Sequence, residues 1–159
     1  MKKHLFKIVI LLLCLSVNFA QVNPRGEATV ELSGGTVTIN YGRPSLKGRD
    51  ISTMISPGEQ WRLGADGSTT LTTKVALTFG DQQIEKGTYT LRGKFVSEGK
   101  WYLLIHSQDY TKVAEIPLIL EKSAENIDRL TMILSGQGKN GSFQLKWGKL
   151  SLSVGVSGS

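Results

Sequence analysis

Two alternating runs meet at a glycine pair in the stretch Ala28-Thr29-Val30-Glu31-Leu32-Ser33-Gly34-Gly35-Thr36-Val37-Thr38-Ile39-Asn40-Tyr41. In both runs every second residue is apolar, which is typical of a β-strand with one face in a core and the other in water. Two such runs joined by a glycine pair predict a β-hairpin with a tight turn. The stretch therefore predicts an antiparallel sheet and sets the expectation for the rest of the chain.

Short runs of the same kind continue to the C-terminus, separated by glycine-rich or polar turns. The further strand candidates are residues 69–73, 75–79, 88–92, 101–106, 113–120, 127–134, 143–147 and 150–156. The pair Asn140-Gly141 suits a type I′ turn, since both residues tolerate positive φ. Only residues 123–130 are candidates for a helix, with Ser123 as its N-cap. This pattern predicts an all-β fold with little helix, an antiparallel β-sandwich, with a partly open β-barrel as the alternative.

The first 20 residues have the three parts of a secretory signal peptide. Lys2, Lys3 and Lys7 are followed by an apolar run over residues 8–17, and the small residue Ala20 precedes the expected cleavage point. The uninterrupted run is about half of the roughly 20 apolar residues that a spanning helix needs. We therefore expect a signal peptide over residues 1–20 and a single β-sandwich domain over residues 21–159. The protein is expected to be exported, periplasmic or extracellular, with no membrane span after cleavage.

Composition narrows the range of partners and of chemistries. The net charge of +6 includes three lysines of the first 20 residues, so it falls to +3 without them. A small positive excess on an exported chain argues against nucleic acid as a partner. The sequence after residue 20 has no cysteine and one histidine, His106, and it contains no Gly-x-Ser-x-Gly motif. These features predict no catalytic nucleophile, no metal site and no cofactor.

A dense cationic stretch follows the second alternating run. It reads Tyr41-Gly42-Arg43-Pro44-Ser45-Leu46-Lys47-Gly48-Arg49, and a second segment reads Trp61-Arg62-Leu63-Gly64-Ala65. Arginine's planar fork suits carboxylate, sulfate or phosphate, and tryptophan stacks on sugars or on arginine. The candidate ligand-binding residues are Arg43, Lys47, Arg49, Trp61, Arg62 and Asp66. The alternative is a structural corner, in which the arginines bind loop carbonyls and Trp61 belongs to the core.

With these segments the chain resembles the domain-of-unknown-function family 2911, exported bacterial proteins of about this length. The resemblance also covers residues 68–73, 86–91, 100–105 and 143–147, and it runs in order from about Ala28 to Val156. It implies an exported, mostly β fold and no particular reaction, cofactor or ligand. One departure stands out: the family pattern continues with Asn-Glu after the second segment, whereas this chain has Asp66-Gly67. A function that rests on that glutamate in relatives is not carried over.

The sequence is compatible with three functions. The first is a non-catalytic protein that binds an extracytoplasmic anionic glycan, lipid or protein partner through the cationic stretch. The second is a glycan-acting hydrolase with two carboxylates brought together by the fold, for which Glu59 and Asp66 are the first candidates. The third is an assembly protein that offers a sheet edge to a partner strand.

Overall fold

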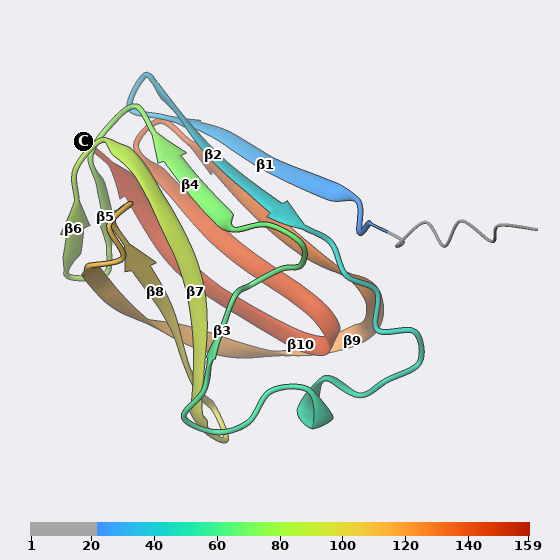
Figure 1. Ribbon diagram of the computed structural model, residues 1–159. Coiled ribbons are helices and arrows are strands. Elements are labelled where there is room, and N and C mark those ends of the chain that lie inside the picture. Colours follow the sequence, from blue (N-terminus) through green and yellow to red (C-terminus); the bar gives the residue numbers. More distant parts are fainter. Residues whose placement is uncertain (1–21) are drawn as a thin grey trace, which may run out of the picture.

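The computed structural model describes residues 22–159, and these form an all-β structure with one short 3-10 turn (Figure 1). The predicted signal peptide lies outside the described residues. The elements are β1 (Arg25–Leu32), β2 (Gly35–Gly42), η1 (Ile51–Thr53), β3 (Gln60–Trp61), β4 (Thr69–Thr73), β5 (Leu77–Phe79), β6 (Gln82–Ile84), β7 (Gly87–Ser97), β8 (Lys100–His106), β9 (Lys112–Gln137) and β10 (Asn140–Gly158). Among the described residues no helix has the length and apolar character needed to cross a membrane.

The strands form one antiparallel sheet that does not close into a barrel. Its order is β1-β2-β4-β7-β8-β9-β10-β5-β6, and the short β3 pairs with β7. The predicted first hairpin is present, with Leu32 opposite Gly35. Its turn residues Ser33 and Gly34 have φ of 50° and 75°, and positive φ at both positions is the mark of a type I′ turn. The predicted all-β, sandwich-like architecture is confirmed.

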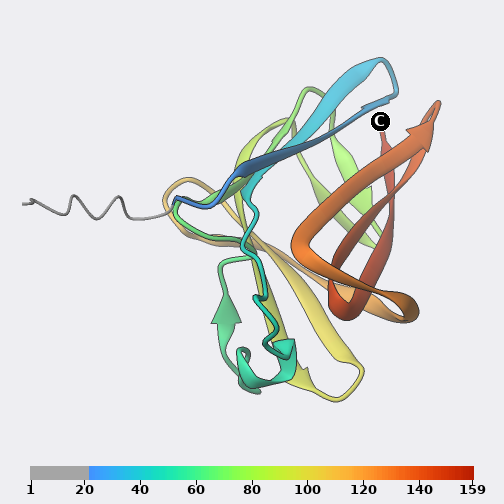
Figure 2. The ribbon, with the colours of Figure 1, turned by 90° about the vertical axis from the view of Figure 1, so that its right-hand side faces the viewer.

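β9 connects the two halves of the sheet. One half contains β1, β2, β4, β7 and β8, and the other contains β10, β5 and β6. The first part of β9 pairs with β8, from Lys112 to Leu118, and the rest pairs with β10 as far as Gln137. In side view the long β9–β10 hairpin, coloured orange to red, faces the half that contains β1, β2 and β4 (Figure 2). One hydrophobic core lies between the halves, and buried residues such as Leu32, Ile39, Leu91, Phe143 and Leu145 contribute to it. Alternation thus places one face of each strand inside, as the sequence predicts.

Two local predictions are wrong. Residues 123–130 are not a helix; they lie within β9, where ten residues (122–131) face only five of β10 (146–150). The extra residues of β9 form bulges, and strand pairing on both sides prevents a helix. The β9–β10 turn consists of Gly138 and Lys139 rather than Asn140-Gly141, which pair with Gln137 and Gly136. Gly138, with φ of 62°, supplies the positive φ that the turn needs.

Side chains connect the end of β2 to the edge of β9 that does not pair with β10. The buried hydroxyl of Tyr41 accepts a hydrogen bond from the Met132 N–H (2.8 Å) and donates one to the Met132 carbonyl (3.3 Å). Just beyond β2, Ser45 forms an isolated antiparallel bridge with Arg129. These contacts satisfy backbone groups of β9 that no neighbouring strand reaches, and they bring residues 43–49 next to the bulged part of β9.

Candidate functional site

The cationic stretch after β2 divides into an inward part and an outward part. Arg43 is half-buried, and its Nε donates to the Leu130 carbonyl (3.1 Å) while its Nη2 donates to Thr131 Oγ1 (3.2 Å). Lys47 and Arg49 are exposed. Arg43 therefore has the geometry of the structural corner, whereas Lys47 and Arg49 are presented to solvent.

A tight turn positions Lys47 and Arg49. The Arg49 N–H donates to the Leu46 carbonyl (3.0 Å), and Lys47 and Gly48 have φ of 51° and 78°. Positive φ at both central positions is the type I′ pattern, which explains a glycine at position 48. The guanidinium of Arg49 folds back on this turn, because its Nε also donates to the Leu46 carbonyl (3.0 Å).

Asp128 fixes the turn to the bulge of β9. Its carboxylate accepts hydrogen bonds from Ser45 Oγ (2.6 Å) and from the Lys47 N–H (3.2 Å). The Asp128 carbonyl accepts from the Leu46 N–H (2.9 Å) and from Trp147 Nε1 (3.1 Å). The bond from Ser45, supported by the Lys47 N–H and the charge of Arg129, lowers the pKa of Asp128. The carboxylate is thus ionised at neutral pH and its oxygens are occupied by the turn.

Three cations surround a hollow of about 220 Å³ at this point, here called the cationic hollow. Lys47, Arg49 and Arg129 line it together with Pro24, Pro44 and Ser45. Arg129 is held by its Nη1, which donates to the Arg43 carbonyl (3.3 Å). Arg129 was missed in the sequence because it lies 80 residues further on, in the segment expected to be helical. Only the bulge of β9 brings it to the turn.

A second hollow adjoins the other side of Arg49. This polar cleft of about 240 Å³ is lined by Arg49, Asp50, Ile51, Asn126, Gly148 and Lys149, among others. Asp50 caps η1 by accepting from the Ser52 N–H (2.8 Å), and that bond is the main cause of its lowered pKa, with a smaller contribution from Lys149. Arg49 lines both hollows, so it is the centre of the candidate site.

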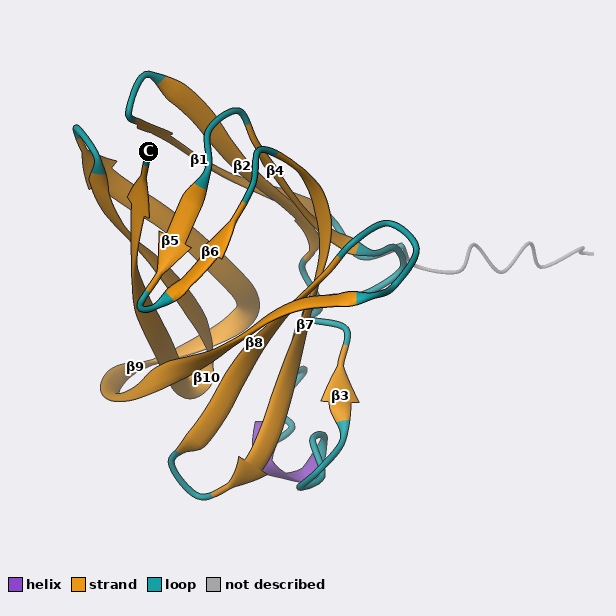
Figure 3. Cartoon of the chain, turned by 90° about the vertical axis from the view of Figure 1, so that its left-hand side faces the viewer, coloured by secondary structure: helices purple, strands orange, loops and turns teal. Residues whose placement is uncertain are grey.

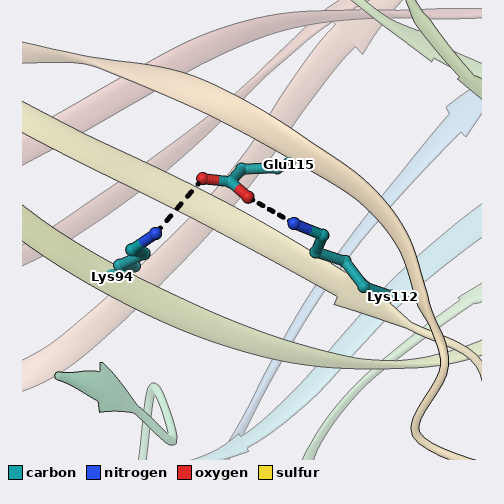
Figure 4. A network of polar contacts seen from close by, with 3 residues as sticks. All are labelled: Lys94, Lys112 and Glu115. Atoms are coloured by element: carbon teal, nitrogen blue, oxygen red, sulfur yellow. Dashed lines mark hydrogen bonds and ion pairs between the residues drawn. The ribbon is translucent and has the colours of Figure 1, made fainter. Parts of the chain in front are cut away.

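The cations of the site have no ion-pair partner among residues 22–159. The ion pairs there all involve Glu115, which contacts Lys94 (3.6 Å) and Lys112 (2.7 Å) across the outer face of the sheet (Figure 4). Lys47, Arg49, Arg129 and Lys149 are exposed and have no carboxylate within ion-pair distance in that range. Asp128 offsets part of the charge of Arg129 and Asp50 part of that of Lys149, and the remaining positive charge is available to an anion from solution.

The other predicted residues lie outside the cationic hollow. Trp61 is half-buried and stacks on the buried Trp147, with ring centroids 5.4 Å apart and planes at 12°. Arg62 is exposed in the loop after β3 and lines none of the hollows described here. Asp66 is also exposed, and its Oδ2 accepts from the Asn23 N–H (2.6 Å). The fold thus unites only Lys47 and Arg49 of the six predicted residues around a cavity.

Glycines let the two sequence segments approach each other. A Cβ on Gly42 would lie 2.0 Å from the Ala65 carbonyl oxygen, so only glycine fits there. A Cβ on Gly64 would lie 2.9 Å from Thr69 Oγ1 and 3.1 Å from the Gly42 carbonyl oxygen. A Cβ on Gly67 would lie 3.4 Å from Arg25 Nη1. The two segments thus pack as a corner.

Asp109 and His106 line neither of the two hollows. Asp109 accepts hydrogen bonds from Ser107 Oγ and from the Thr111 N–H within its own loop. His106 is buried, and its Nδ1 has no hydrogen-bond partner in the described part of the chain. No group of three or more histidines, cysteines or carboxylates within residues 22–159 has the arrangement to hold a metal ion.

A family model described as "Protein of unknown function (DUF2911)" matches residues 23–156. That range covers nearly all of the described residues, so the chain belongs to the DUF2911 family. No significant match was found among curated proteins or among solved structures.

Proposed function

We propose that this member of the DUF2911 family is an exported, non-catalytic binding protein that takes the anionic group of an extracytoplasmic ligand at Arg49. The observation that carries the proposal is the cationic hollow, where Lys47, Arg49 and Arg129 line one cavity and form no ion pair among residues 22–159. Export is supported by the basic and apolar pattern of residues 1–20.

The arrangement favours binding over hydrolysis. Arg49 and Arg129 are held in place by hydrogen bonds to the carbonyls of Leu46 and Arg43, which leaves further N–H groups for a ligand. Such preorganised forks suit the paired oxygens of a carboxylate, sulfate or phosphate group. The two carboxylates considered for a hydrolase, Glu59 and Asp66, line none of the hollows described here.

Thermal unfolding in sulfate, with sodium chloride at equal ionic strength as the reference, tests the proposal. A ligand that binds only the folded protein raises the Tm, and the increase grows with its concentration relative to the Kd. Losing one hydrogen bond to a charged group costs about 1.5–3 kcal/mol, so Arg49→Gln should weaken sulfate binding about tenfold or more. Lys47→Gln and Arg129→Gln should each weaken it as well.

Arg62→Gln is the matched control, because Arg62 is equally exposed and lies outside the hollow. It should leave the sulfate response unchanged. An equal loss in Arg62→Gln and Arg49→Gln, or no sulfate-specific shift in the parent protein, would reject the Arg49 site.

A further inference from the structure

The hydrophobic core is open at one end, where it forms an apolar groove of about 290 Å³. The groove is lined mainly by Ile51, Ile55, Phe95, Trp101, Leu120 and Leu150. Figure 3 shows η1, the purple element, at the same end of the molecule as the turn between β7 and β8. Residues of η1 and of the loop after it thus form one wall of the groove.

The strand residues of the groove continue the core rather than the outer surface. Leu120 follows Ile116 and Leu118 at every second position of β9, and both of these are buried. Trp101 precedes Leu103 in the same way on β8, and its ring packs on Phe95 with centroids 4.6 Å apart. Leu120 nevertheless remains 43% exposed. Apolar surface that faces inward yet stays in contact with water favours an apolar occupant.

The groove leads directly into the polar cleft of the Arg49 site. Ile51 and Lys149 line both, and Arg49 lines the cleft on its other side. Two carboxylates are nearby: Asp50 in the cleft, bound to the Ser52 N–H, and Glu98 in the turn between β7 and β8. Because Lys149 and Arg49 form no ion pair among residues 22–159, an acidic group finds its partners at the end of the groove that meets the cleft.

We propose that the ligand is an amphiphilic anion, with its apolar body in the groove and its acidic head between Lys149 and Arg49. This inference rests on the proposed function, since it keeps Arg49 as a partner of the anionic group and names the class of ligand, but it places the head in the polar cleft beside Arg49 rather than in the cationic hollow. At about 290 Å³ the groove lies near the lower end of the volumes of ligand pockets, which suits a single medium-length acyl chain. The cations at one end of the groove and the apolar walls at the other determine the orientation of the bound ligand.

Calorimetric titration with octyl sulfate, below the concentration at which it forms micelles, tests the proposal. Inorganic sulfate supplies the head alone and octanol supplies the tail alone. Octyl sulfate should bind at least tenfold more tightly than either. Lys149→Gln should weaken octyl sulfate binding and leave octanol binding unchanged.

Substitutions at two neighbouring residues distinguish binding in the groove from nonspecific adsorption to the protein surface. Leu120→Glu places a negative charge in the groove and should abolish octyl sulfate binding. Ile119→Glu is the matched control. Ile119 directly precedes Leu120 in the strand, is 64% exposed and does not line the groove. The Ile119→Glu variant should bind octyl sulfate like the parent protein, and both variants should keep the parental Tm in the absence of ligand.

The outcomes distinguish this inference from the proposed function. Octyl sulfate that binds no more tightly than sulfate overturns the amphiphile and leaves the anion site intact. Octanol that binds as tightly as octyl sulfate, with no response to sulfate, overturns both. An equal effect of Ile119→Glu and Leu120→Glu, or binding to phospholipid vesicles without binding to monomeric octyl sulfate, also overturns the groove as the site.

Discussion

At the scale of single residues, His106 should make the stability of the fold depend on pH. It lies at the end of β8, buried, and its pKa is lowered by burial first and then by the charges of Arg92 and Lys112. In the unfolded chain its pKa should return to about 6.5. The folded protein therefore holds this ring neutral where the unfolded chain protonates it.

We expect the free energy of unfolding to decrease as the pH falls below about 6.5, because the unfolded state then binds the proton more readily. The decrease should end once the pH is below the lowered pKa of the folded state. His106→Gln should remove this slope, which urea unfolding at several pH values between 7.5 and 5 measures. A variant that keeps the full slope would show that another group causes it.

The roles of the individual arginines in the cationic stretch could not be predicted from sequence. Spacing alone could not separate Arg43 from Arg49, since both are arginines in one turn-rich segment. Their roles differ because Arg43 meets the edge of β9, with its Nε on the Leu130 carbonyl, whereas Arg49 bonds only to its own turn. The distinction depends on a strand more than 80 residues away, and local pattern carries no information about it.

At the scale of elements, the alternation of apolar residues predicted the strands well, because each has one buried face. The prediction failed at β9, where bulges place ten residues opposite five and no simple period survives. Asp128 and Arg129 both lie in that irregular part. The residues of the candidate site that sequence missed are thus those that the bulge positions.

The edge of β9 depends on one hydroxyl group. Tyr41→Phe keeps the buried ring and removes the partner of both the Met132 N–H and the Met132 carbonyl. Buried groups left unpaired cost about 1–3 kcal/mol, so the free energy of unfolding should fall by about that amount. Tyr110→Phe is the control, since Tyr110 is 61% exposed, and it should change stability little. Equal effects in urea unfolding would contradict the proposed role of Tyr41.

At the scale of the whole molecule, the sheet stays open and its two halves meet through side chains at the corner. Arg43 reaches from the end of β2 to Leu130 and Thr131 of β9, and Asp128 binds the turn from the same side. The corner therefore serves the fold, while Lys47, Arg49 and Arg129 on its outer side remain unpaired among the described residues. One short segment thus contains both the support of the fold and the proposed anion site, because its side chains point in two directions.

Two substitutions in this segment should consequently affect different properties, one the stability and the other the binding of sulfate. Arg43→Gln removes hydrogen bonds from a charged donor to β9 and should lower stability by about 1.5–3 kcal/mol, which urea unfolding measures directly. Arg49→Gln loses contacts only within its own exposed turn, so the free energy of unfolding should change by about 0.5 kcal/mol or less, while the sulfate response is lost. If Arg43→Gln instead removed the sulfate response without destabilising the protein, Arg43 would belong to the site. The corner would then be part of the binding surface rather than the support beneath it.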